Sequence, residues 1–314
     1  PGVSLAWRAS EENWWKDNIR FIDYFKLRGS VSQTGNDALV DGDGNYDHSI
    51  QYLTTYAFNN AGTVFGGQEN KRLYPSRTPN PNITWEVGTT YNVGLDFKFL
   101  QNRLSWETDV FYHKRTNMLI SRNASLPEIT GITLPRENLG EMKNRGFESL
   151  VSWQDKIGEV EYGASLNMTY ARNEITFWDE VQNVPEYQFS TGRPVGSRNM
   201  LHTQAEIDDA RAKGLLYSDN TVPGDIRFKD MNGDGKIDGL DRIRPEKNQE
   251  PRFVAGLTLT AKWKGFDLMM LWQGATGAEV YIETWSGLVG NFLKSDYDKR
   301  WTPENPYSEG PRTW

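Results

Sequence analysis

The chain has 314 residues, and its 13% of aromatic residues argues against disorder. The net charge is −7 and basic residues are scattered among acidic ones, so nothing favours binding to a nucleic-acid backbone. The absence of Cys excludes disulfides, thiolate metal sites and cysteine nucleophiles. Mean hydropathy is −0.69 and no apolar run is long enough for a spanning helix, which leaves strands as the only candidate membrane segments.

The first alternating pattern in the chain is a weak one. Apolar and polar residues alternate over 3–9 and again over 25–31, and a tryptophan-rich segment at 11–23 joins the two stretches. Period two is typical of a β-strand with one apolar face. We therefore predict a hairpin with an unusually long connection.

A stronger pattern follows. Over 83–99 the odd positions are apolar or aromatic with one Thr, and the even positions are polar or Gly. A short turn at 100–102 leads into a second alternating stretch at 104–113. Two alternating runs around a short turn predict a β-hairpin.

The same unit occurs twice more. Residues 147–153 and 160–170 alternate on either side of a tight turn near Gly158. Residues 253–263 lead through Lys264 and Gly265 into a further alternating stretch at 266–272. These strands exceed the roughly 5 to 6 residues usual in soluble sheets, and several reach the roughly 9 to 11 that cross a bilayer at a tilt.

Short turns alternate with long connections, which we place at 36–82, 118–144 and 175–250, with a last one at 277–314. Transmembrane barrels have this asymmetry, with tight periplasmic turns and long extracellular loops. A sheet in lipid must close on itself so that no edge stays unpaired. The pattern favours an all-β chain that forms part of a transmembrane antiparallel β-barrel. The alternative is a soluble β-sandwich, in which the apolar face of each strand points inward.

Several phrases, in this order along the chain, resemble the SusC/RagA family of TonB-dependent outer-membrane transporters of Bacteroidota. They are 7–8 (WR), 27–30 (LRGS), 33–36 (QTGN), 80–86 (NPNITWE), 144–148 (NRGFE), 223–226 (PGDI), 230–238 (DMNGDGKID), 264–268 (KGFDL), 273–274 (QG) and 300–306 (RWTPENP). Each phrase alone is weak, but the ordered set is specific and covers nearly the whole chain.

The resemblance implies a 22-stranded barrel with a plug in its lumen. It also implies a SusD-like surface lipoprotein as partner, the TonB complex as energy source, and a glycan or peptide nutrient as cargo, in the bacterial outer membrane. We expect residues 1–314 to be one barrel segment, with the plug domain and the contact to TonB in missing N-terminal parts. The resemblance implies no enzymatic activity.

The sharpest local motif is an acidic loop that begins at Asp230. Its oxygen-bearing positions follow the order of an EF-hand calcium loop, with Gly235 at the position that needs a sharp turn. Asp241 stands at position 12, where a Glu is usual, and the flanks do not read as EF-hand helices. A structural Ca²⁺ ion and an acidic turn held by its own hydrogen bonds both fit this pattern. The candidate metal ligands are Asp230, Asn232, Asp234, Lys236, Asp238 and Asp241.

Aromatic residues in or beside the connections are weak candidates for stacking on a sugar substrate. The commoner explanation is anchoring at the membrane interface or packing against a partner. The candidates are Trp14, Trp15, Trp178, Tyr187, Phe189 and Trp285.

Enzymatic signals are missing from the sequence. The three His residues are far apart, and there is no nucleophile elbow, Walker A loop or dinucleotide fingerprint. A capping box at Thr203 predicts only a surface helix through about Lys213. We therefore expect no catalytic residue and no redox or organic cofactor. The rival functions are a secreted, Trp-rich β-sandwich that binds glycans and, behind it, a glycosidase.

Overall fold

The computed structural model describes residues 1–37, 52–77, 79–122, 135–181, 183–195, 200–201, 203–204, 225, 227–279, 294–305 and 312. The chain divides into two compact units. Unit 1 comprises residues 1–182, 190–195 and 250–278, and unit 2 comprises 183–189, 196–249 and 279–314.

Unit 1 contains the long strands. Its elements are β1 (Gly2–Trp7), η1 (Ala9–Glu11), α1 (Asn13–Asn18), β2 (Ile22–Asn36), β3 (Thr55–Phe65), β4 (Gln68–Arg77), β5 (Glu86–Phe99), β6 (Leu104–Ser121), β7 (Arg136–Ile157), β8 (Val160–Phe177), β13 (Phe253–Trp263) and β14 (Phe266–Thr276). The elements of unit 2 are η3 (Glu186–Gln188), β9 (Met200–Leu201), β10 (Thr203–Gln204), β11 (Arg227–Phe228), η4 (Gly239–Asp241), β12 (Arg242–Ile243) and α3 (Lys294–Lys299).

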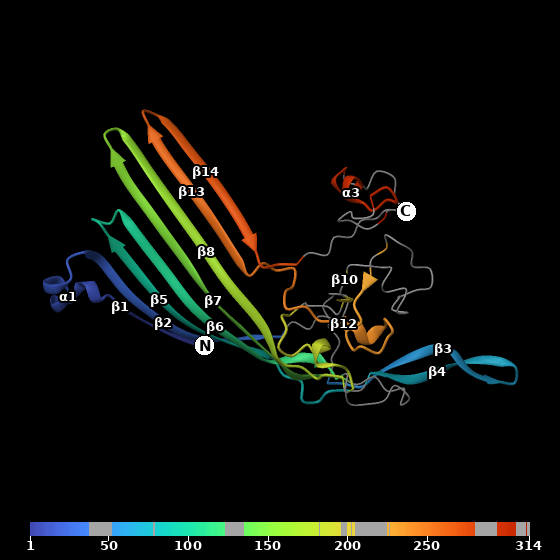
Figure 1. The fold of residues 1–314 in the computed structure, drawn as a ribbon. Coiled ribbons are helices and arrows are strands. Elements are labelled where there is room, and N and C mark those ends of the chain that lie inside the picture. The colour runs from blue at the N-terminus through green and yellow to red at the C-terminus, as the bar shows by residue number, and fades with distance from the viewer. Residues whose placement is uncertain are drawn as a thin grey trace. The chain divides into compact units, whose positions relative to one another are not determined.

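Eight strands of unit 1 form one antiparallel sheet in the order β1-β2-β5-β6-β7-β8-β13-β14. In Figure 1 they run side by side, and the short connections lie together at one end of the sheet. Lys264 and Gly265, with φ of 46° and 86°, form the two-residue turn between β13 and β14. Positive φ at both turn residues matches the right-handed twist of the flanking strands. The tight turns predicted between the strands of these hairpins are therefore present.

All four predicted hairpins are present, as β1–β2, β5–β6, β7–β8 and β13–β14. The strand ends differ from the prediction. Pairing between β6 and β7 continues past a register shift at Met118, so both strands reach into the range 118–144 that we predicted as a connection. Asn117, with φ of 57°, interrupts the alternation there, and this break hid the continuation of the strands.

The long connections contain short elements of their own. Strands β3 and β4 pair as a hairpin inside the predicted range 36–82. In unit 2, β10 pairs with β11 and β9 with β12. The helix predicted from Thr203 is not seen at its first residues, because Thr203 and Gln204 form β10, and its remainder at 205–213 lies outside the described residues.

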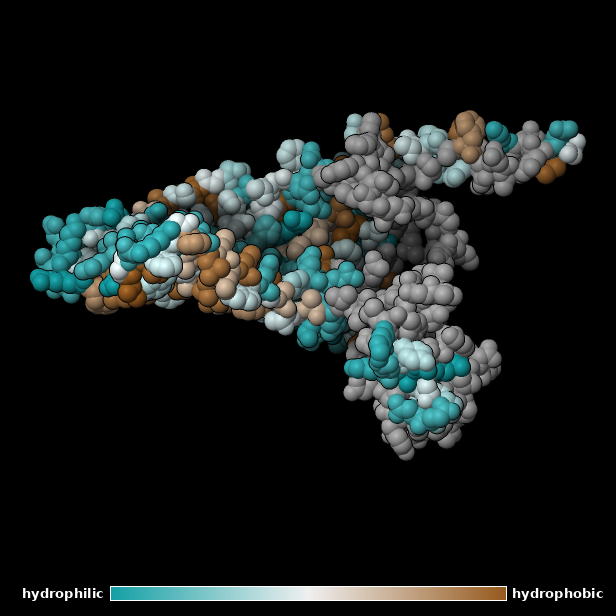
Figure 2. Space-filling model, turned by 90° about the horizontal axis from the view of Figure 1, so that it is seen from above, coloured by the Kyte–Doolittle hydropathy of each residue, from teal (hydrophilic) through white to brown (hydrophobic). Residues whose placement is uncertain are grey.

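The sheet has little interior. Among the described residues the buried apolar side chains are Ala9, Trp15, Ile120, Ile175 and Ile237, whereas many large apolar side chains along the strands are exposed. Figure 2 shows hydrophilic residues at the end of the sheet where the tight turns lie, with apolar residues behind them along the strands. An apolar surface of this extent is typical of a sheet that contacts lipid or further protein beyond the described residues. No helix in the described part of the chain has the length and apolarity to cross a membrane.

Candidate functional site

The strand register sorts the side chains of the eight-stranded sheet onto two unlike faces. Directly opposite residues point to the same face, so the pairs Arg28–Gly94 and Gly94–Asp109 define one polar row. The neighbouring pairs Gly29–Val93 and Val93–Val110 define an apolar row on the other side. The apolar face comprises Leu5, Leu27, Val93, Val110, Phe147, Leu166, Leu257 and Trp272, and the polar face comprises Ser4, Arg28, Asn92, Asp96, Asp109, Glu148, Asn167, Thr258 and Gln273.

In the part of unit 1 that the structure describes, no second sheet covers the apolar face. Trp85, Tyr91 and Leu257 keep 61%, 49% and 36% of their surface exposed. The β-sandwich alternative requires these side chains to be buried between two sheets. Their exposure favours a sheet whose apolar face meets lipid.

The apolar stretch of β6 is also as long as the membrane-spanning part of a barrel strand. On β6 the apolar side begins at Leu104 and continues through Trp106 and Val110 to Tyr112, after which Lys114 follows on the same side. A tilted strand crosses the hydrocarbon layer in roughly 9 to 11 residues. The change from Tyr112 to Lys114 therefore marks one margin of a band that fits a bilayer.

On the polar face, Arg28 of β2 connects three strands. Its guanidinium donates hydrogen bonds to Asp96 of β5 at 2.7 Å and to Asp109 of β6 at 2.8 Å. Gly94 lies between them, and a Cβ there would stand 2.6 Å from the Arg28 guanidinium carbon and 2.6 Å from a carboxylate oxygen of Asp109. Gly94 thus makes room for the charged group to cross β5. None of these residues was predicted from the sequence to have a function.

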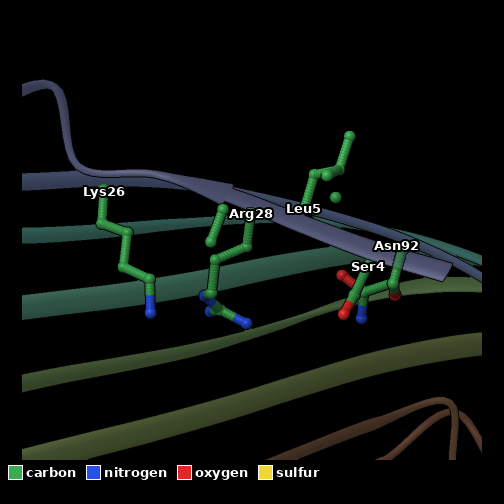
Figure 3. A pocket seen from close by; sticks show the side chains of 8 residues that line it. Ser4, Leu5, Lys26, Arg28 and Asn92 are labelled. Carbon is green, nitrogen blue, oxygen red and sulfur yellow. The ribbon is translucent and has the colours of Figure 1, made fainter.

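A shallow cavity of about 390 Å³ lies beside this cluster, at the edge strand β1. Figure 3 shows Ser4, Lys26, Arg28 and Asn92 pointing to one side of the sheet and Leu5 to the other. Lys26 has no ion pair or hydrogen bond among the described residues. The wall of the polar face is therefore hydrophilic and charged, as the lining of a water-filled passage would be.

Trp14 and Trp15, two of the candidate substrate residues, belong to an aromatic cluster at the tight-turn end. Trp15 is buried and stacks on Phe25 of β2 at a centroid distance of 4.9 Å, and Phe25 contacts Phe97 of β5 at 4.8 Å. Trp14 contacts both Trp15 and Trp7. Phe25, Phe97 and Trp7 stand on the apolar face. This arrangement favours anchoring at an interface, and contact with a substrate stays a prediction.

The other aromatic candidates are placed separately. Trp178 is half-buried just after β8, Phe189 is half-buried just after η3, and Trp285 lies outside the described residues. The hydroxyl of Tyr187 donates a hydrogen bond to the carbonyl of Leu240 at 2.7 Å. Burial, followed by the negative charge of Asp241, raises the pKa of the Tyr187 phenol. Within unit 2, Tyr187 therefore ties η3 to the acidic loop, a role that its sequence position did not reveal.

The acidic loop at 230–241 is held by its own side chains. Asp230 accepts hydrogen bonds from the backbone N–H groups of Gly233 and Gly235 at 2.6 and 3.0 Å. Asp241, fully buried, accepts from the N–H groups of Met231 at 2.8 Å and Asp238 at 2.7 Å. Gly235 has φ of 81°, which agrees with the predicted sharp turn. These bonds are those of the hydrogen-bonded acidic turn, one of the two structures that the sequence allows.

The carboxylates of this loop do not converge on one point. Within the described ranges no group of three or more His, Cys, Asp or Glu side chains is arranged to hold a metal ion. Calcium binding by this loop therefore stays a prediction. To bind the ion, the carboxylates would have to give up their hydrogen bonds to backbone N–H groups. The predicted ligands are Asp230, Asn232, Asp234, Lys236, Asp238 and Asp241.

We expect Asp241→Ala to loosen this loop. The substitution removes the carboxylate that accepts from the backbone N–H groups of Met231 and Asp238 at a fully buried position. Each buried group left without a partner costs about 1 to 3 kcal/mol. Hydrogen exchange at Met231 and Asp238 in the full-length protein should accelerate by at least about tenfold. Asp238→Ala is the milder comparison, because Asp238 is exposed and its side chain accepts hydrogen bonds only at the start of η4, where it forms the capping box. Unchanged exchange in Asp241→Ala would contradict the assigned role.

Comparison with known proteins supports the two-faced sheet. The chain is 28% identical over 333 residues to the TonB-dependent receptor P26 of Formosa agariphila, an alignment that covers 99% of this chain and 32% of that protein. It is 28% identical over 292 residues to the TonB-dependent receptor SusC of Bacteroides thetaiotaomicron, which covers 90% of this chain and 28% of SusC. The chain thus spans about a third of the length of these curated relatives.

Solved structures show the same fold. The RagAB peptide transporter superposes with a TM-score of 0.69 at 22% identity, over 99% of this chain and 34% of that one. The RagAB peptide importer in its open-open state superposes with a TM-score of 0.70 at 20% identity, over 99% of this chain and 33% of that one. The family model described as TonB dependent receptor-like, beta-barrel, matches residues 1–239. The chain therefore belongs to the TonB-dependent receptor-like β-barrel family, whose members are outer-membrane transport proteins and not enzymes, as the sequence analysis predicted.

Proposed function

We propose that this chain is a wall segment of an importer in the bacterial outer membrane, which takes up a nutrient with energy from TonB. The observation that carries the proposal is the sheet with one exposed apolar face and one charged face. Lipid covers the first face and the second lines the passage. The edges of β1 and β14, which are free among the described residues, pair with further strands, because an open edge in lipid would leave backbone groups unsatisfied.

The proposed importer works with a SusD-like surface lipoprotein, and its cargo is a peptide or a glycan. Likeness to the RagAB peptide importer supports the peptide, and the resemblance to the SusC/RagA family supports the glycan and the lipoprotein. The long connections face the cell exterior, where they meet partner and cargo. No covalent chemistry is required of the chain. Its contribution is to position the cargo and to exclude lipid from the passage.

The test uses the full-length protein in its native host. A transporter requires detergent for extraction, brings a lipoprotein with it through purification, and supports TonB-dependent uptake of labelled oligosaccharide or peptide. A glycan-binding β-sandwich, the rival function, would extract in buffer without a lipoprotein. Uptake that persists in a strain without TonB would contradict the proposed energy source, and the two labelled cargoes decide between glycan and peptide.

We also propose a structural Ca²⁺ ion in the acidic loop at 230–241. The order of oxygen-bearing residues supports it, and Asp241 in place of a longer Glu predicts weak binding, with a dissociation constant of about 10⁻⁴ to 10⁻³ M. Calorimetric titration of the full-length protein with Ca²⁺ should give one such site that Asp234→Asn weakens at least about tenfold. An identical titration of wild type and Asp234→Asn would refute the ion, while the hydrogen-bonded loop would remain.

A further inference from the structure

Two arginines stand directly opposite each other on the apolar side of the sheet. Arg145 of β7 pairs in register with Arg172 of β8, and Tyr112 of β6 is the other neighbour of Arg145 in the same row. Neither arginine has an ion pair or hydrogen bond with any residue that the structure describes. Like charges placed directly opposite each other in a sheet are destabilising. The pair therefore costs stability unless an anion joins it.

The neighbouring glutamates form ion pairs with lysines and do not pair with the two arginines. In the next row toward the long connections, Lys143 pairs with Glu174 at 2.8 Å, and Lys114 pairs with Glu141 at 2.9 Å. These two lysines and two glutamates balance one another. The net charge of this patch is therefore positive and comes from the guanidinium groups of Arg145 and Arg172.

The pair lies at the margin of the apolar band. Two residues closer to the tight turns, Phe147 and Tyr170 stack at a centroid distance of 6.0 Å on the same face. Arg145 is exposed and Arg172 is half-buried. Arginines next to a row of aromatic residues reach the headgroup layer with their charged ends while their stems stay in the apolar zone.

We propose that Arg145 and Arg172 together bind the anionic phosphate of a membrane lipid headgroup, in the leaflet on the side of the long connections. Guanidinium groups bind phosphate oxygens through paired hydrogen bonds, and two of them on adjacent strands offer donors to one phosphate. A lipid is favoured over free phosphate because its acyl chains lie along the apolar band below. This inference rests on the proposed function, because it requires the apolar face to contact lipid.

The experiment compares wild type with Arg145→Gln/Arg172→Gln in the full-length protein, purified in neutral detergent. The probes are dioleoyl phosphatidylglycerol, dioleoyl phosphatidylcholine and inorganic phosphate. Native mass spectrometry measures bound lipid, and thermal unfolding measures stabilisation. Lys26→Gln/Lys98→Gln is the matched control, because it removes two positive charges from the polar face. Arg145→Lys/Arg172→Lys keeps the charge and loses the paired donors.

We expect phosphatidylglycerol to bind the double Gln variant at least about tenfold more weakly than wild type, with the Lys variant between them and the control unchanged. Without anionic lipid the Gln variant should unfold at the same temperature as wild type or higher, because the repulsion is gone. Two results overturn the inference. One is equal affinity of wild type and the double Gln variant for phosphatidylglycerol, and the other is stabilisation of wild type by inorganic phosphate as large as its stabilisation by phosphatidylglycerol. A protein that needs no detergent would overturn the proposed function instead.

Discussion

Gly146→Ala is expected to disrupt the pairing of β7 with β8. A Cβ at this position would lie 1.9 Å from the carbonyl oxygen of Tyr170 and 2.8 Å from the ring of Phe111. The first contact is with backbone of the neighbouring strand, which cannot move without breaking the register. Overpacking usually costs about 1 to 3 kcal/mol, and this site should reach at least the upper end. Urea unfolding of the full-length protein in lipid vesicles measures the loss.

Gly29→Ala is the matched control, because Gly29 also lies in a long strand but no atom lies within 4 Å of an added Cβ. Its stability should stay within about 0.5 kcal/mol of wild type. Adding Phe111→Leu to Gly146→Ala should restore only part of the loss, since the Tyr170 carbonyl remains. Full stability of Gly146→Ala alone would mean that the close approach of β7 and β8 is not kept in the membrane.

The hairpins were predictable because each depends on local information. Period-two alternation on both sides of a short turn determines which residues pair, as at Lys264 and Gly265 between β13 and β14. The continuation of β6 and β7 past Met118 was missed because the register shift there breaks the alternation. The pairings that join the hairpins, such as β8 with β13, are separated by long connections and have no local signal.

The residues of the candidate site show the same division. The apolar and polar faces follow from alternation alone, so the residues of each face were predictable as sets. The Arg28 cluster was not, because Asp96 and Asp109 meet Arg28 only through the register of three strands. The contact of Tyr187 with Leu240 likewise joins residues far apart in sequence. A single sequence contains no marker for such contacts.

The second large effect is expected from a charge on the apolar face. Leu166 and Asn167 are neighbours on β8 that point to opposite faces, Leu166 beside Val151 and Leu257, and Asn167 opposite Gly256. Leu166→Arg should destabilise the full-length protein in vesicles by about 2 to 4 kcal/mol, because the charge must leave water for the middle of the lipid layer. Asn167→Arg should cost far less, because its side chain stays on the polar face. Urea unfolding in vesicles compares the two variants.

Destabilisation by Leu166→Arg alone does not separate the membrane barrel from a β-sandwich, since a sandwich also buries this side chain. Spin labels separate them, and residues 1–314 contain no Cys that would compete for labelling. A label at Leu166→Cys in a barrel should collide with oxygen dissolved in lipid and be protected from a water-soluble nickel complex, and a label at Asn167→Cys should show the reverse. Protection of the Leu166→Cys label from both reagents would mean that protein covers the apolar face. This result would contradict the proposed function as an importer.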